Sequence, residues 1–179
     1  MEYYRNEIIK KDMSRVALGT WSIGGWLWGG SDLKAAEKTI FKALQMGINT
    51  IDTAPVYGFG VSEELVGKVV KEFGNRDELI IATKCGLDWN DGKVFRNSSK
   101  ERIFKEIDDS LRRMQLDYID IYQVHWPDEN VPFEETAEVM LKLYEVGKIL
   151  QIGTSNYNVE QMKRFKKVAP LHSNQPPYN

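Results

Sequence analysis

Short apolar runs rich in isoleucine, valine and tyrosine alternate with longer amphipathic runs along the chain. The short runs predict strands, and the long runs, whose apolar positions recur every three or four residues, predict helices. The predicted strands cover residues 15–21, 49–54, 78–84, 118–126, 148–156 and 171–175. The predicted helices cover residues 33–46, 63–73, 100–115, 134–146 and 159–167. Strands separated by helix-length crossovers indicate a parallel sheet of right-handed βαβ units.

Several predicted helices carry capping signals at their ends. Gly47 and Gly147 follow the first and fourth helices, where glycine readily adopts the left-handed conformation. Ser98 and Asn158 each have Glu or Gln three residues later, which is the spacing of a capping box. Ser62 is the expected N-cap of the second helix. The glycines just before it are therefore interpreted as a turn, because they lack the rest of a phosphate-binding fingerprint.

Polar residues stand at the ends of four successive strands, at Asp52, Lys84, His125 and Asn156. In a parallel (β/α) barrel the carboxyl ends of all strands meet on one face, so residues far apart in sequence converge there. We therefore predict an α/β fold of the (β/α)8 TIM-barrel type, formed by a single domain over residues 1–179.

Composition and charge narrow the function. Hydrophobic residues make up 42% of the chain and charged residues 28%, as in ordinary globular proteins. A net charge of −2 argues against nucleic-acid binding. No apolar run approaches the ~20 residues that span a membrane, and "MEYYRNEIIKKDM" has no secretory signal. The lone Cys85 fits a reducing compartment, so we expect a cytoplasmic protein. Two histidines and one cysteine disfavour a metal site.

Asp52, Lys84 and His125 are expected to share a pocket with Tyr57, which lies on the loop in "TIDTAPVYGFG". A free tyrosine has a pKa near ~10 and needs assistance to exchange protons near neutral pH. A lysine ammonium favours the phenolate and is expected to lower that pKa by ~1–3 units, while a carboxylate keeps the buried lysine charged. A histidine can orient a carbonyl oxygen. This set suits carbonyl reduction with hydride from a cofactor.

Five segments, "NTIDTAPVYGFGVSEELVG", "IIATKCG", "DYIDIYQVHWPD", "IGTSNYN" and "SNQPPYN", resemble the aldo-keto reductase family in the same order. The resemblance implies a catalytic tetrad of Asp52, Tyr57, Lys84 and His125, with Tyr57 as general acid. It also implies that residues 2–14 form a hairpin at the bottom of the barrel. The family reduces aldehydes and ketones, usually with NADPH, and NADH is not excluded here.

The same resemblance implies further site residues. Ser155, Asn156 and Gln175 would hold the nicotinamide carboxamide, and Thr20 and Trp21 would lie beside the cofactor, as would Asp52. The substrate pocket would contain Trp21, Tyr57, His125 and Trp126. The expected partner is a small-molecule carbonyl compound.

Each candidate also has an ordinary structural interpretation. Aspartate after a strand is more often a turn residue, a loop tyrosine is usually only a surface aromatic, and lysine at a strand end is usually solvated. Cys85, next to Lys84, is expected to face away from the pocket and pack against a helix. The joint pattern of four groups favours the catalytic interpretation.

A closed barrel of this type has eight strands and about 250 residues, whereas this chain reaches only its sixth strand. We therefore expect an incomplete barrel with two open sheet edges. Three resolutions are open: a fragment of a longer product, self-association of two copies, or a rearranged packing of the same units, and the first two are favoured over a stable six-stranded monomer. Two alternatives to the reductase remain open: a non-catalytic nucleotide-binding or regulatory protein, and an inactive chain that self-associates.

Overall fold

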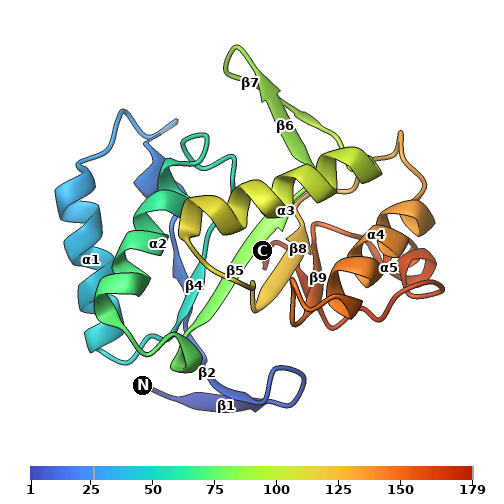
Figure 1. Cartoon of the computed structure of the whole chain (residues 1–179). Coiled ribbons are helices and arrows are strands. Elements are labelled where there is room, and N and C mark those ends of the chain that lie inside the picture. Colours follow the sequence, from blue (N-terminus) through green and yellow to red (C-terminus); the bar gives the residue numbers. More distant parts are fainter. Residues whose placement is uncertain (26, 179) are drawn as a thin grey trace.

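The computed structural model describes residues 1–25 and 27–178, and its centre is a parallel sheet (Figure 1). The six strands lie in the order β10-β9-β8-β5-β4-β3, and every neighbouring pair is parallel. Their bounds are β3 Leu18–Gly19, β4 Thr50–Asp52, β5 Ile80–Cys85, β8 Ile121–Val124, β9 Ile152–Ser155 and β10 Ser173–Gln175. This topology confirms the predicted incomplete barrel.

In the described part of the chain, five α-helices pack outside the sheet (Figure 1). Their bounds are α1 Leu33–Gln45, α2 Val61–Phe73, α3 Lys100–Met114, α4 Phe133–Glu145 and α5 Val159–Phe165, and the short 3-10 helices are η1 Trp21–Gly24 and η2 Arg76–Glu78. The main core lies between sheet and helices, where Ile107, Tyr122 and Met140 are fully buried. Cys85 faces this layer, with its Sγ 3.9 Å from Met140 Sδ, as the strand alternation predicts.

Three of the predicted helix caps are confirmed. Gly47 and Gly147 follow α1 and α4 with φ of 88° and 76°, the left-handed conformation that glycine adopts without strain. Asn158 forms a capping box with Gln161 at the start of α5.

Two predicted caps are wrong. Ser99, not Ser98, is the N-cap of α3, and no side chain completes a capping hydrogen bond there. Gly60 is the N-cap of α2, so Ser62 lies inside the helix. The Ser62 hydroxyl is buried and donates instead to Thr20 Oγ1 at 2.8 Å, which ties the helix to the segment after β3.

An N-terminal hairpin, β1 Tyr3–Asn6 and β2 Lys11–Ser14, lies below the amino ends of the strands (Figure 1). Lys11 Nζ donates to Asp120 Oδ1 at 2.7 Å, and Asn6 Nδ2 donates to Gln151 Oε1 at 2.9 Å. Ile9 packs against the inner face of the sheet. These contacts confirm the predicted hairpin at the bottom of the barrel.

A second hairpin, β6 Leu87–Asn90 and β7 Lys93–Arg96, was not predicted. It projects from the end of the sheet opposite the first hairpin (Figure 1). Asp91 and Gly92 form its turn with φ of 47° and 76°, so both central residues are left-handed, as a type I′ turn requires. No helix among residues 1–25 and 27–178 is long and apolar enough to cross a membrane.

Candidate active site

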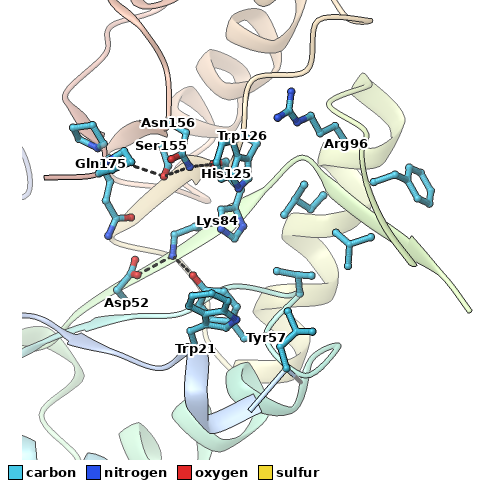
Figure 2. A pocket seen from close by; sticks show the side chains of 17 residues that line it. Trp21, Asp52, Tyr57, Lys84, Arg96, His125, Trp126, Ser155, Asn156 and Gln175 are labelled. Atoms are coloured by element: carbon cyan, nitrogen blue, oxygen red, sulfur yellow. Dashed lines mark hydrogen bonds and ion pairs between the residues drawn. The ribbon is translucent and has the colours of Figure 1, made fainter. Parts of the chain in front are cut away.

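All the predicted site residues except Thr20 gather at the carboxyl ends of the strands, around a cavity of about 610 Å³ (Figure 2). Asp52 ends β4, Lys84 lies in β5, and His125 directly follows β8. Ser155 ends β9 and Gln175 ends β10. All of these residues line the cavity together with Tyr57, Asn156, Trp21 and Trp126.

Lys84 is the centre of the site. Its ammonium donates to Asp52 Oδ2 at 2.8 Å and to the Tyr57 hydroxyl at 3.3 Å (Figure 2). It also donates to the Thr53 carbonyl oxygen at 3.0 Å. The Lys84 side chain is 2% exposed and the Asp52 side chain 16%. Asp52 supplies the carboxylate partner that a buried lysine requires. All three ammonium protons are used, so Lys84 is held in one orientation.

Two glycines allow the Tyr57 loop to approach the chain before α1. A Cβ on Gly24 would lie 2.3 Å from the carbonyl carbon of Tyr57, and one on Gly58 would lie 2.3 Å from the Gly24 oxygen. Gly58 also has a φ of 67°. Larger residues at either position would push Tyr57 away from Lys84. Gly58 of "YGFG" therefore serves backbone packing against Gly24 at this point.

The pKa of Tyr57 is raised above its usual 10, mainly because burial disfavours the phenolate. The charge of Lys84 lowers this pKa, in the predicted direction, while the charge of Asp52 raises it. The prediction of a net decrease is thus wrong for the protein alone, because burial and the carboxylate outweigh the ammonium. Tyr57 is therefore protonated at neutral pH and ready to donate.

His125 stands beside the phenol, with its ring centroid 5.8 Å from that of Tyr57 and the two rings nearly perpendicular. Burial, assisted by the charge of Lys84, lowers the pKa of His125 to about 3. The imidazole is thus neutral at physiological pH, with one N–H to donate and one nitrogen to accept. It can orient a carbonyl oxygen without competing with Tyr57 as the acid.

Ser155, Asn156 and Gln175 form the neighbouring wall. Asn156 Nδ2 donates to the His125 carbonyl oxygen at 2.9 Å and to Ser155 Oγ at 3.0 Å, and Ser155 Oγ donates to the Gln175 carbonyl oxygen at 3.0 Å. Within the described chain, Asn156 Oδ1 and the Gln175 side-chain amide have no partner. One free acceptor and one free amide match the NH₂ and C=O of a carboxamide.

Thr20 differs from the other predicted site residues because it does not line the cavity. It is fully buried, and its hydroxyl donates to the Asp52 carbonyl oxygen at 3.0 Å. Trp21, the next residue, does reach the cavity, and its ring lies 6.3 Å from that of Tyr57 at an interplanar angle of 28°.

The sequence interpretation missed several residues at the site. Gln123 lies two residues before His125, on the same inner face of the sheet, and donates to Asp52 Oδ1 at 3.4 Å. The β6–β7 hairpin contributes Leu87, Val94, Phe95 and Arg96 to the cavity wall. The Asp91–Gly92 turn within alternating polar and apolar residues was the available signal for this hairpin. The structure places no group of three or more His, Cys, Asp or Glu side chains suited to a metal ion among residues 1–25 and 27–178.

Residues 15–179 match the family model described as "Aldo/keto reductase family". The chain is 57% identical over 179 residues to the aldo-keto reductase YhdN of Bacillus subtilis. The alignment covers 100% of this chain and 54% of that protein. The chain is 38% identical over 182 residues to the NADH-specific methylglyoxal reductase of Escherichia coli, which covers 93% of this chain and 56% of that protein.

Among solved structures, the glycerol dehydrogenase of Gluconobacter oxydans superposes with a TM-score of 0.92 and 50% identity. The match covers 99% of this chain and 55% of that structure. The chain thus spans about half the length of the curated relatives it matches.

Proposed function

The chain belongs to the aldo/keto reductase family, and on that premise we propose that it reduces aldehydes or ketones to alcohols with NAD(P)H. Tyr57 is the general acid in this proposal. The observation that supports it is the position of Lys84 Nζ, which is within hydrogen-bond distance of both the Asp52 carboxylate and the Tyr57 hydroxyl.

The tetrad would divide the chemistry of carbonyl reduction among its members. Tyr57 donates its hydroxyl proton to the carbonyl oxygen as that oxygen gains negative charge. The ammonium of Lys84 stabilises the phenolate that remains, and Asp52 supplies the opposite charge beside that ammonium. Neutral His125 donates a hydrogen bond to the same carbonyl oxygen and fixes its direction. In the reverse reaction Tyr57, as phenolate, takes the proton from an alcohol.

The hydride would be supplied by a bound nicotinamide dinucleotide. Ser155, Asn156 and Gln175 are suited to hold its carboxamide because their free acceptor and amide groups lie on the wall next to the tetrad. We propose NADPH as the preferred form. One relative is named as NADH-specific, so both nucleotides belong in the assay.

The test is a Tyr57→Phe variant assayed by nucleotide oxidation with a panel of aldehydes. Loss of the proton donor should lower kcat by about 10²- to 10⁴-fold, while nucleotide binding and the circular dichroism spectrum are retained. Tyr144→Phe, on the outer helix α4, is the matched control and should keep full activity. An unchanged rate in Tyr57→Phe would refute the role of Tyr57. Nucleotide affinity without turnover in the wild type would instead favour a binding or regulatory protein.

We also propose that the chain self-associates, because β3 and β10 are edge strands of the sheet. β3 offers only two paired residues to its neighbour, and β10 three. Light scattering coupled to size-exclusion chromatography should give a mass above 20.6 kDa. A monomer mass at micromolar concentration would contradict this proposal and leave the proposed reaction untouched.

A further inference from the structure

One arginine differs from all the others in its partners. The chain contains eight arginines, and seven of them lie within ion-pair distance of a carboxylate. Arg96 is the exception: among residues 1–25 and 27–178 its guanidinium has no ion pair or hydrogen bond, and its contact is the ring of Trp126. An arginine that lacks a carboxylate partner keeps five N–H donors free for a ligand.

This arginine lines the same cavity as the tetrad. It ends β7 opposite Leu87, and Figure 2 shows it on the side of the pocket away from Asp52. Its guanidinium carbon lies 5.4 Å from the centroid of the Trp126 ring. Trp126 directly follows His125 in the chain. This cation–π contact holds the exposed guanidinium beside the ring and leaves its N–H donors without a protein acceptor among the described residues.

The hairpin that carries Arg96 is fastened to the body of the protein. Arg102, on α3, forms an ion pair with Asp88 at 3.0 Å and donates to the Leu87 carbonyl oxygen at 3.0 Å. Its guanidinium also lies 5.3 Å from the Trp89 ring centroid. Because Leu87 pairs with Arg96 in the hairpin register, these contacts fix the backbone at the position that Arg96 occupies.

The charge balance of the cavity leaves Arg96 uncompensated. Asp52 is the one carboxylate among the described lining residues, and it is already paired with Lys84. The wall on the hairpin side is otherwise apolar, with Leu87, Val94 and Phe95. A ligand that fills the cavity thus meets a polar, reactive end at the tetrad and a single unmatched positive charge on the hairpin side.

We propose that Arg96 binds an anionic group, a carboxylate or a phosphate, on the carbonyl substrate. This inference rests on the proposed reductase function and names its substrate class: aldehydes or ketones whose anionic group is separated from the carbonyl by an apolar spacer. Arg96 acts on specificity. Its guanidinium pairs with the anion through two parallel N–H donors, while the carbonyl end of the same molecule lies at Tyr57 and His125.

The test compares benzaldehyde, 4-carboxybenzaldehyde and 4-formylphenyl phosphate, which share one ring and differ in charge. In the wild type, kcat/KM should be higher for at least one anionic aldehyde than for benzaldehyde. In Arg96→Gln the ratio of kcat/KM, anionic over neutral, should fall by about 10- to 100-fold, mainly through KM. The anionic aldehyde that loses more identifies the favoured group. Arg96→Lys keeps the positive charge but not the planar guanidinium, so its ratio should lie between those of the wild type and Arg96→Gln.

Lys93→Gln is the matched control, because it removes one positive charge from the same strand outside the cavity lining. It should leave the ratio at the wild-type value. An unchanged ratio in Arg96→Gln would overturn the inference. So would an equal loss for neutral and anionic aldehydes, which indicates a structural role. A weaker NADPH affinity with an unchanged ratio would assign Arg96 to the cofactor instead, and would also overturn it.

A binding measurement separates this inference from the proposed function. 4-(Hydroxymethyl)benzoate and 4-(hydroxymethyl)phenyl phosphate, the alcohol products, are titrated calorimetrically against each variant, with benzyl alcohol as the neutral reference. The wild type and Lys93→Gln should bind at least one anionic product more tightly than Arg96→Gln does by about 10-fold or more. This result without any turnover would refute the reductase and support the anion site. Turnover with the same product affinities in all variants would support the reductase and refute the anion site.

Discussion

The two ends of the incomplete barrel contain the same three residue types in different surroundings. At the carboxyl end Lys84 pairs with Asp52 at 2.8 Å, and its ammonium lies 5.0 Å from the Tyr57 ring centroid. At the amino end Lys11 pairs with Asp120 at 2.7 Å, and its ammonium lies 5.5 Å from the Tyr118 ring centroid. Residue type alone therefore does not distinguish a candidate active site from a structural anchor.

Burial is reversed between the two clusters. At the carboxyl end the lysine is the buried member, with 2% exposure, while Asp52 keeps 16%. At the amino end Asp120 is fully buried and Lys11 keeps 14%. Asp120 also forms an ion pair with Arg76 at 2.6 Å and accepts from the Ile81 backbone N–H at 2.9 Å. Both carboxylate oxygens of Asp120 therefore have partners within the protein.

The two phenols point to different places. The hydroxyl of Tyr57 lies at the Lys84 ammonium inside the cavity. The ring of Tyr118 stacks on Arg76 at 4.3 Å, and its hydroxyl reaches outward to Asp77 at 3.4 Å. A phenol can act as an acid only where a substrate can reach its oxygen. The orientation of the phenol and its access to an open cavity, rather than the lysine–aspartate pair, therefore distinguish the cluster at the carboxyl end from the cluster at the amino end.

Asp120→Asn tests the structural end and should have the largest effect. It leaves Lys11 and Arg76 without their carboxylate, and the guanidinium of Arg76 cannot be neutralised by losing a proton. We expect the free energy of unfolding to fall by about 3 kcal/mol, which is at the low end of the range for a broken buried ion pair. The low end applies because Lys11 and Arg76 both keep some contact with solvent. Urea unfolding followed by circular dichroism measures it. Asp109→Asn, in an exposed pair on α3, should cost less than about 1 kcal/mol. Equal losses in the two variants would contradict the assignment.

Asp52→Asn tests the reactive end. The ammonium of Lys84 loses its counter-charge and with it much of its effect on the phenolate of Tyr57. We expect kcat to fall about 100-fold, which corresponds to about 2.7 kcal/mol of activation free energy. Stability should fall less than in Asp120→Asn, because this variant removes the carboxylate partner of one cation, whereas Asp120→Asn removes that of two. If Asp52→Asn is strongly destabilised but keeps its kcat, the carboxyl-end cluster is a structural anchor and the assignment of the two ends is wrong.

Acid titration distinguishes the two ends of the barrel, because His125 lies only at the carboxyl end, beside Tyr57. Its pKa is about 3 when folded, against 6.5 for the free group. The unfolded chain therefore binds the extra proton between these values, and stability is lost as the pH falls from 6.5 towards 3. Allowing for partial exposure of the ring, His125→Gln should lose about 1–2 kcal/mol less than the wild type between pH 7 and pH 4.5. Urea midpoints at the two pH values provide the measurement. Identical losses would mean that His125 is not held neutral by burial.

Much of the reactive end was predictable from the sequence because its residues follow the strand period. Asp52, Lys84 and His125 lie at or next to the carboxyl ends of strands whose apolar pattern places them on one side of the sheet. The amino-end cluster was not predicted, although Asp120 interrupts an apolar run and was visible as an anomaly. Its partner Lys11 comes from a hairpin more than a hundred residues earlier, and no local pattern encodes that distance.

The errors arose where tertiary contacts override local signals. Ser62 has the sequence context of an N-cap, yet its hydroxyl is used by Thr20 in the core. The direction of the Tyr57 pKa depends on how much burial accompanies the ammonium, which residue types do not specify. Arg96 was passed over because one arginine in a short charged segment resembles any solvated residue until its lack of a carboxylate partner is seen.

Tyr118→Phe removes the lower phenol and should have the smallest effect. Its hydroxyl makes one exposed contact at 3.4 Å, a distance at which little free energy is gained. The ring, which stacks on Arg76, is retained in phenylalanine. We expect less than about 0.5 kcal/mol of destabilisation and an unchanged reductase rate, measured by urea unfolding and by nucleotide oxidation. A rate loss like that expected for Tyr57→Phe would mean that the lower cluster takes part in the chemistry. The contrast between the two ends would then fail.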